Sequence, residues 1–230
     1  MDKIILITGS SKGIGFEIAR QCGKMHYHVI LSGRDETRLK KAVERLHLEQ
    51  IEADSILMDI SSKESIKNAS EKFATWNMKI DVLINNAAIL LHEDTSLLLN
   101  DECILEKTIL TNSYGALNVT KSFLPFIKSP GKILMLSSEG GILNGPLKGW
   151  SPAYCLSKTL LNGITKQLAY ELLEKDISVN AVSPGYVRTD MGGKNAPQSV
   201  EKGAETVVWL AMINFPDTGR FWKDKEIIGW

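Results

Sequence analysis

The segment IILITGSSKGIG, residues 4 to 15, joins an apolar run to three glycines within seven positions. Gly9, Gly13 and Gly15 have no side chain to pack in a core, so they indicate close approach to the backbone. A helix-period pattern follows at once, so free backbone N–H groups gather at a helix N-terminus. Such a terminus binds phosphate, because its unpaired donors and its dipole both favour an anion. Taken alone, the glycines also allow a plain tight turn, whereas a P-loop is excluded because its G-x-x-x-x-G-K-[ST] spacing is absent.

Short apolar strands alternate with longer helical segments along the rest of the chain. We expect strands at residues 3–8, 28–33, 55–60, 81–86, 132–138 and 177–185, with a last one near 219–225. We expect helices near 14–24, 36–48, 62–76, 96–127 (as two helices), 152–175 and 199–213. Apolar strands between helices are typical of a parallel sheet that is covered on both faces. The sequence therefore predicts one doubly wound α/β domain over residues 1–230, with its ligand site at the carboxyl ends of the strands.

The charge balance and the cysteines narrow the class of protein. Lys plus Arg and Asp plus Glu both number 27, so the basic excess typical of nucleic-acid binders is absent. No apolar run is long enough to cross a bilayer, and the start is typical of a first strand rather than a signal peptide. Cys22, Cys103 and Cys155 are scattered and odd in number, which favours reduced thiols in a cytoplasmic protein. His26 and His28 lack a third ligand placed by the sequence, so we expect no metal.

Six short motifs occur in a fixed order along the chain. They are TGSSKGIG at 8–15, NNAA at 85–88, TNSYGA at 111–116, LSS at 136–138, YCLSK at 154–158 and SPGYVRTD at 183–190. Together they resemble the short-chain dehydrogenase/reductase family over essentially the whole chain. The resemblance implies a Rossmann-type fold of about seven parallel strands with helices on both faces, and a bound nicotinamide dinucleotide.

The resemblance also implies which residues contact this cofactor. Asp59 would accept a hydrogen bond from the adenine amino group, Asn86 and Ala87 would lie beside the adenosine ribose, and Val187 would meet the carboxamide. The full expected set is Gly9, Ser11, Lys12, Gly13, Ile14, Gly15, Arg34, Asp59, Ile60, Asn86, Ala87, Tyr154, Lys158, Pro184, Gly185, Val187 and Thr189.

The end of the second expected strand indicates which dinucleotide is bound. An NAD-preferring protein carries an acidic residue there to bind the ribose 2′-hydroxyl, whereas this chain has Gly33 followed by Arg34. A guanidinium pairs with a 2′-phosphate through two parallel hydrogen bonds, and Lys12 is a second cation nearby. Solvated surface charges are the alternative. Two cations without an acid favour NADP.

Tyr154 and Lys158 share one face of an expected helix because they are four residues apart. A free tyrosine has a pKa of about 10, and a nearby ammonium lowers this pKa toward the range useful for acid–base catalysis. The resemblance assigns Tyr154 as the acid in reduction, Lys158 as its partner on the nicotinamide ribose, and Ser138 as the donor to the substrate oxygen. It assigns Asn112 to a helix, where it helps to hold a proton-relay water. Ser137 is the competing serine.

The C-terminal tail resembles the carbonyl-reductase branch, whose members reduce aldehydes, ketones and quinones with NADPH. The long insertion that some of them carry is absent, since only 15 residues separate Ser138 from Tyr154. Reduction of a small-molecule carbonyl is thus the leading hypothesis. Oxidation of a secondary alcohol and a cofactor-sensing signalling role are the alternatives.

Two of the expected helices carry more apolar residues than one buried helix face needs. On the helix of Tyr154 they are Leu156, Leu160, Leu161, Ile164, Leu168 and Leu172, and on the preceding one Leu117, Phe123, Leu124 and Ile127. Surplus apolar surface indicates a second burial partner. In the family that partner is commonly the same helix pair of another subunit, so we expect a homodimer or homotetramer.

Overall fold

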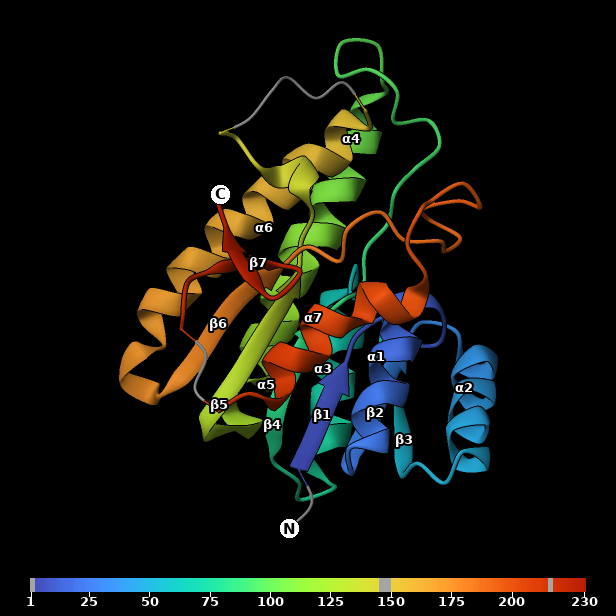
Figure 1. Ribbon diagram of the computed structural model, residues 1–230, viewed down its shortest axis with the longest axis vertical. Helices are drawn as coiled ribbons and strands as arrows, with labels where there is room; N and C mark the ends of the chain where they lie inside the picture. Colours follow the sequence, from blue (N-terminus) through green and yellow to red (C-terminus); the bar gives the residue numbers. More distant parts are fainter. Residues whose placement is uncertain (1–2, 145–149, 215–216) are drawn as a thin grey trace.

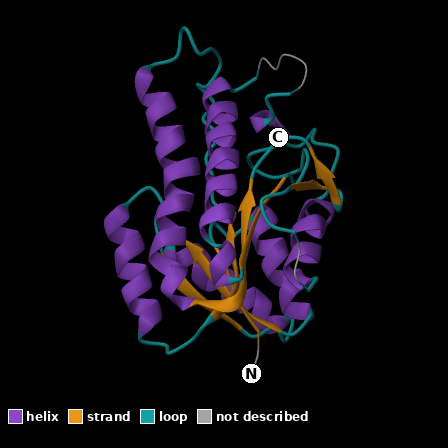
Figure 2. Cartoon of the chain, turned by 90° about the vertical axis from the view of Figure 1, so that its left-hand side faces the viewer, coloured by secondary structure: helices purple, strands orange, loops and turns teal. Residues whose placement is uncertain are grey.

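An eight-stranded sheet separates two layers of helices in the computed structural model, which describes residues 3–144, 150–214 and 217–230 (Figures 1 and 2). The strands are β1 (Lys3–Ile7), β2 (Tyr27–Gly33), β3 (Ala53–Leu57), β4 (Ile80–Asn85), β5 (Ile127–Leu136), β6 (Ile177–Val182), β7 (Phe221–Lys223) and β8 (Glu226–Ile228). Their order across the sheet is β3-β2-β1-β4-β5-β6-β7-β8. β1 pairs in parallel with both β2 and β4, so the winding reverses there and opens a crevice at the carboxyl ends of the strands.

The helices cover both faces of this sheet. They are α1 (Gly13–Lys24), α2 (Glu36–Leu48), α3 (Lys63–Ala74), α4 (Glu102–Ile109), α5 (Ala116–Phe123), α6 (Pro152–Glu171) and α7 (Val200–Met212). A π-helical segment, η1 (Leu110–Gly115), joins α4 to α5, and three short 3₁₀ turns are η2 (Leu124–Phe126), η3 (Glu139–Gly141) and η4 (Leu173–Lys175). No helix within the described ranges has both the length and the apolar character needed to cross a membrane.

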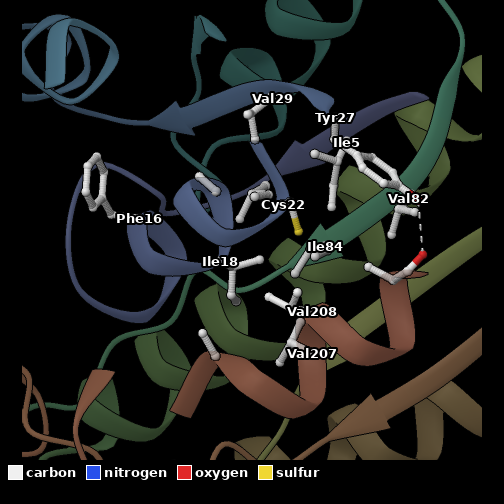
Figure 3. Packing of buried hydrophobic residues seen from close by; sticks show 14 of the residues in the cluster. Ile5, Phe16, Ile18, Cys22, Tyr27, Val29, Val82, Ile84, Val207 and Val208 are labelled. Carbon is white, nitrogen blue, oxygen red and sulfur yellow. Dashed lines mark hydrogen bonds between the residues drawn. The ribbon is translucent and has the colours of Figure 1, made fainter. Parts of the chain in front are cut away.

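Two separate hydrophobic cores hold the layers together. One core packs α1, α2 and α7 on one face of the sheet, and the other packs α3, α5 and α6 on the opposite face. In the first core, Ile18 of α1 lies beside Val207 and Val208 of α7, and the Cys22 sulfur points toward Ile84 of β4 (Figure 3). The Tyr27 hydroxyl at the edge of this core donates to the Ala211 carbonyl oxygen over 3.4 Å. The strands between the cores are therefore apolar on both faces, as their sequences indicate.

The element order follows the sequence prediction, with differences in detail: β3 ends at Leu57 rather than at 60, β6 at Val182 rather than at 185, and α6 at Glu171 rather than at 175. Residues 96–101 are not helical, and the helical run that follows contains the π segment η1 between α4 and α5. β5 begins at Ile127 rather than at 132. The expected final strand is a hairpin of β7 and antiparallel β8, so the sheet has eight strands rather than seven. Asp224 and Lys225 both have positive φ, 49° and 66°, which suits a two-residue hairpin turn.

Candidate active site

The glycine turn after β1 is pressed against the segment after β4. Gly9 has a φ of 63°, and a Cβ there would lie 2.8 Å from the Ala87 Cα. A Cβ on Gly15 would lie 2.5 Å from the Asn86 Nδ2. Backbone atoms and a bonded side chain cannot move away easily, so these two positions require glycine. The close approach suspected from the sequence is therefore in part an approach of protein to protein.

Asn86 and Ala87 brace this turn with four hydrogen bonds. The Asn86 Nδ2 donates to the Thr8 and Gly9 carbonyl oxygens over 2.8 and 3.0 Å. The backbone N–H groups of Asn86 and Ala87 each donate to the Thr8 Oγ1 over 3.0 Å. The NNAA motif thus fixes the shape of the turn, a contact that the sequence did not reveal.

The N-terminus of α1 differs from those of α2, α3, α4 and α7 in its capping. At the starts of α2, α3, α4 and α7, the side chain of the residue before the helix accepts a hydrogen bond from a backbone N–H of the first turn. These residues are Asp35, Ser62, Asp101 and Ser199. In the described part of the chain, no side chain caps α1, and its first turn holds no acidic residue. Free donors and an uncompensated dipole favour an anion at this point.

Charged residues gather beside the turn, where β2 ends. Arg34 is exposed after Gly33, and the Ser11 Oγ lies 3.8 Å from where a Gly33 Cβ would stand. Lys12 forms an ion pair with Asp190, a partner that the sequence did not indicate. Lys12 is thus not a free second cation.

Arg38 belongs to the same group of charges and was missed by the sequence reasoning. Its Nε lies 3.1 Å from an oxygen of Asp35. The Lys12 ammonium, and to a smaller extent Arg38, hold the pKa of Asp190 below its ordinary value. The available signal was a second arginine in the first turn of the helix that follows Arg34.

Asp59 and Ile60 lie in the turn that follows β3, beyond the carboxyl end of the strand. The Asp59 Oδ1 accepts from the Ser61 N–H and the Ser61 hydroxyl over 2.9 and 2.7 Å. Ile60 is buried, and its carbonyl oxygen would lie 2.7 Å from a Cβ on Gly115. This contact ties the turn after β3 to η1.

Tyr154, Ser138 and Lys158 meet where α6 passes the end of β5. The Tyr154 side chain forms a hydrogen bond with Ser138, and the Lys158 Nζ lies 5.5 Å from the centre of the Tyr154 ring. The Ser138 Oγ also accepts from the Gly140 N–H over 3.0 Å. Ser137 instead faces the interior, where its hydroxyl donates to the Asn162 Oδ1 over 2.5 Å. Of the two candidate serines, Ser138 is therefore the one beside Tyr154.

Burial, rather than the ammonium, dominates the acid–base properties of this group. Burial raises the pKa of Tyr154 to about 12, against a smaller lowering by its bond to Ser138. Burial also lowers the pKa of Lys158 to about 7. The sequence prediction that Lys158 lowers the pKa of Tyr154 is thus wrong for this structure. The physical reason is burial, which outweighs the other influences on Tyr154, while the Lys158 Nζ donates to the Leu136 carbonyl oxygen over 2.8 Å.

Asn112 lies in η1, the π segment, and its side chain forms hydrogen bonds with the loop after β4 and with α6. Its side chain accepts from the Ile89 N–H over 2.8 Å and donates to the Ile89 carbonyl oxygen over 2.9 Å. It also donates to the Ser157 Oγ over 3.0 Å, and Ser157 donates to the Tyr154 carbonyl oxygen. π segments are frequent at functional sites, since the extra residue turns a side chain inward.

The segment SPGYVRTD arches over the glycine turn. Gly185 has a φ of 77°, and the preceding Pro184 is partly buried. Val187 is buried, with its Cγ2 only 2.6 Å from where a Gly203 Cβ would stand. The Thr189 Cγ2 lies 3.6 Å from the corresponding position on Gly13. The structure thus brings this segment and the glycine turn to one crevice.

His28 and Cys155 have polar partners of their own in the structure. Within the described ranges, no cluster of three or more His, Cys, Asp and Glu side chains could hold a metal. His28 contacts Asp54, with 2.9 Å between the Nε2 and Oδ2 atoms. The Cys155 thiol donates to the Trp150 carbonyl oxygen over 3.2 Å.

Known proteins resemble this chain over nearly its full length. The NADPH carbonyl reductase 1 of Mus musculus is 32% identical over 276 residues, which cover 99% of this chain and 98% of that protein. The (+)-neomenthol dehydrogenase of Arabidopsis thaliana is 32% identical over 287 residues, covering 96% of each. The 276 residues exceed the 230 of this chain, so the mouse protein carries extra residues within the matched range.

Solved structures share the fold. The NADPH-bound carbonyl reductase from chicken fatty liver has a TM-score of 0.90 at 22% identity and covers 100% of this chain and 99% of its own. The carbonyl reductase Sniffer of D. melanogaster has a TM-score of 0.88 at 24% identity, covering 100% of both chains. A family model described as short chain dehydrogenase matches residues 3–199. The chain therefore belongs to the short-chain dehydrogenase family.

Proposed function

We propose that this protein reduces the carbonyl of a ketone, aldehyde or quinone to an alcohol with NADPH, and that Tyr154 is the general acid. One observation carries the proposal. The Tyr154 side chain bonds to Ser138 beside the buried Lys158, at the sheet edge that also holds the glycine turn. A hydride donor bound at that edge and a proton donor can then act on one carbonyl. The relatives named as NADPH carbonyl reductases support the same activity.

The crevice fits a nicotinamide dinucleotide. The uncapped N-terminus of α1 presents backbone donors to an anion, as a pyrophosphate requires. Gly9, Ser11, Lys12, Gly13, Ile14 and Gly15 would surround this group; Asp59, Ile60, Asn86 and Ala87 would lie toward the adenosine, and Pro184, Gly185, Val187 and Thr189 toward the nicotinamide. When bound, NADPH supplies a hydride from its nicotinamide ring.

The end of β2 suits a 2′-phosphate rather than a 2′-hydroxyl. Gly33 offers no carboxylate to the hydroxyl, whereas Arg34 is exposed and available for a bidentate contact. Arg38 adds a second guanidinium on the same side. We assign most of the preference to these two arginines, because Lys12 already pairs with Asp190.

Tyr154 is suited to give a proton in the reductive direction. With its pKa raised to about 12, its hydroxyl is protonated at neutral pH and donates to the oxygen that gains negative charge. The Ser138 hydroxyl, held beside it, donates a second hydrogen bond to the same oxygen. The two donors act on charge that develops only in the transition state.

Lys158 and Asn112 support the return of the proton. The pKa of Lys158, lowered to about 7, lets its amine exchange a proton near neutral pH, so it can resupply Tyr154. We assign Asn112 the task of shaping the path to solvent, since its side chain fixes the backbone of Ile89 next to α6. Lys158 would also hold the nicotinamide ribose.

Alcohol oxidation is the second candidate, favoured by the likeness to a neomenthol dehydrogenase. The same Tyr154 would then act as the base, so the reaction centre does not separate the two directions. A cofactor-sensing role without turnover would need no ordered Ser138–Tyr154–Lys158 group. A measurement of turnover would distinguish the cofactor-sensing role from carbonyl reduction and from alcohol oxidation.

A carbonyl panel assayed with NADPH and NADH in parallel tests the proposal. We expect NADPH oxidation with at least one ketone, aldehyde or quinone. Tyr154→Phe should lose nearly all turnover and keep NADPH binding, because the ring remains while the proton donor is gone. Tyr170→Phe is the matched control, since Tyr170 lies exposed on the same helix. Tyr154→Phe activity above a tenth of wild type would contradict the assignment.

We further propose that two copies of the chain associate through α6 and the adjacent segment η1. Leu161, Leu168 and Leu172 pack inside the chain, so the surplus on α6 is smaller than the sequence indicates. An apolar surface still remains on the outer sides of η1 and α6, where Leu110, Tyr114, Leu156 and Tyr170 are between 40% and 75% exposed. A symmetric contact would bury it in a homodimer or a tetramer built from it.

We place the protein in the cytoplasm on the number and spacing of its cysteines. Cys22, Cys103 and Cys155 are odd in number, scattered and without CxxC spacing, which favours a reducing compartment. Burial raises the pKa of the Cys22 thiol to about 12, which keeps it unreactive.

A further inference from the structure

The helix that carries Tyr154 and Lys158 begins without a cap of its own. Ser151 precedes it in the left-handed region, with a φ of 39°, and its side chain caps no N–H. Pro152 follows without an N–H, and the Cys155 N–H donates to the Ser151 carbonyl oxygen over 3.0 Å. Only the N–H groups of Ala153 and Tyr154 are left to satisfy. Both residues are buried, so unpaired donors there would be costly.

Asp94 supplies both missing acceptors from about 60 residues earlier in the chain. Its Oδ1 accepts from the Ala153 N–H over 3.0 Å, and its Oδ2 accepts from the Tyr154 N–H over 2.9 Å. Its side chain is buried, with 3% of the residue exposed. A carboxylate is favoured here, because it faces the positive end of the α6 dipole.

The loop that carries Asp94 is itself fixed to the site. The Asn100 Nδ2 donates to the Asp94 Oδ1 over 2.9 Å, and the Asn100 Oδ1 accepts from the Thr95 and Ser96 N–H groups. At the other end of the loop, Asn112 binds the N–H and the carbonyl oxygen of Ile89. Asp94 therefore stands at a set position relative to Asn112.

We infer that Asp94 is a positioning residue for the reaction: its carboxylate clamps the first turn of α6 and so sets where the Tyr154 hydroxyl stands relative to Ser138. The inference rests on the proposed function of Tyr154. Without the clamp, the first turn of α6 loses its two anchored N–H groups, and the Tyr154 ring moves with the backbone that carries it. The part of the crevice at α1 is formed by other residues, and Lys158 lies in the second turn of α6, beyond the two clamped N–H groups, so cofactor binding is largely spared.

Asp94→Ala and Asp94→Asn test this role in the whole protein. The alanine variant removes both acceptors, whereas asparagine keeps one oxygen and so one of the two bonds. We expect kcat to fall about a hundredfold for alanine and about tenfold for asparagine, with the KM and Kd for NADPH within twofold of wild type. Asp101→Ala is the matched control, because Asp101 caps the Cys103 N–H at the start of α4.

Amide hydrogen exchange gives a second readout that does not depend on activity. Exchange at Ala153 and Tyr154 should rise in both Asp94 variants and stay unchanged in Asp101→Ala. If wild type shows this protection but no carbonyl turnover, the proposed function fails while the clamp stands. An Asp94→Asn kcat within twofold of wild type would overturn the inference, as would a parallel loss of kcat and NADPH affinity. The asparagine variant decides alone if the alanine variant does not fold.

Discussion

Replacing Lys158 by methionine should abolish turnover and make the protein more stable at neutral pH. The Lys158 side chain is buried, with 2% of the residue exposed, and burial lowers its pKa from 10.5 to about 7. The unfolded chain restores the ordinary value, so folding at pH 7 must largely discharge this amine or bury its charge. That costs on the order of 4 kcal/mol at pH 7 and about 2 kcal/mol at pH 9.

The sign follows from the lowered pKa of Lys158. The cost is complete below the folded pKa, shrinks as the pH rises, and is gone above the unfolded value of 10.5. Methionine removes the cost but also loses the bond to the Leu136 carbonyl oxygen, worth about 1 kcal/mol at every pH. The free energy of unfolding of the variant should thus exceed that of wild type by about 3 kcal/mol at pH 7 and by about 1 kcal/mol at pH 9.

Urea denaturation of both proteins from pH 7 to pH 10 measures this difference directly. Lys166→Met on the same helix is the matched control, because Lys166 is exposed and its ammonium contacts the Trp230 ring, 5.3 Å from the ring centre. Its effect should be small and equal at each pH. A Lys158→Met difference that does not change between pH 7 and pH 9 would refute the reasoning, as would a variant less stable than wild type at pH 7.

Three further predictions concern the cofactor, the glycine turn and assembly. NADPH should bind at least about tenfold more tightly than NADH, and Arg34→Ala should remove most of that preference in a fluorescence titration; equal wild-type affinities would contradict it. Gly9→Ala should destabilise the fold by roughly 1–3 kcal/mol in thermal unfolding, because its φ is 63° and the Ala87 Cα is too close. Light scattering at micromolar concentration should give at least twice the 25.5 kDa of one chain; a monomer mass unchanged on dilution would contradict association.

The sequence by itself determined the fold and the residue types of the site. Local patterns were sufficient for this, since apolar strands, amphipathic helices and glycine spacing depend on neighbours in the chain. The element order and the doubly wound sheet followed from them. The family resemblance then indicated Asn112, Ser138, Tyr154 and Lys158 together, and the structure brings three of them into contact distance at the end of β5, with Asn112 joined through Ser157.

Only the tertiary structure decided what these residues meet. Asp190 pairs with Lys12 across 178 residues of chain, and Asp94 caps α6 across about 60. No local pattern records such pairs, because each partner has an ordinary sequence context. The pKa values of Tyr154 and Lys158 were decided in the same way, since they depend on how much protein surrounds each group. A charge pair inferred from i,i+4 spacing says nothing about burial, and burial was the larger effect.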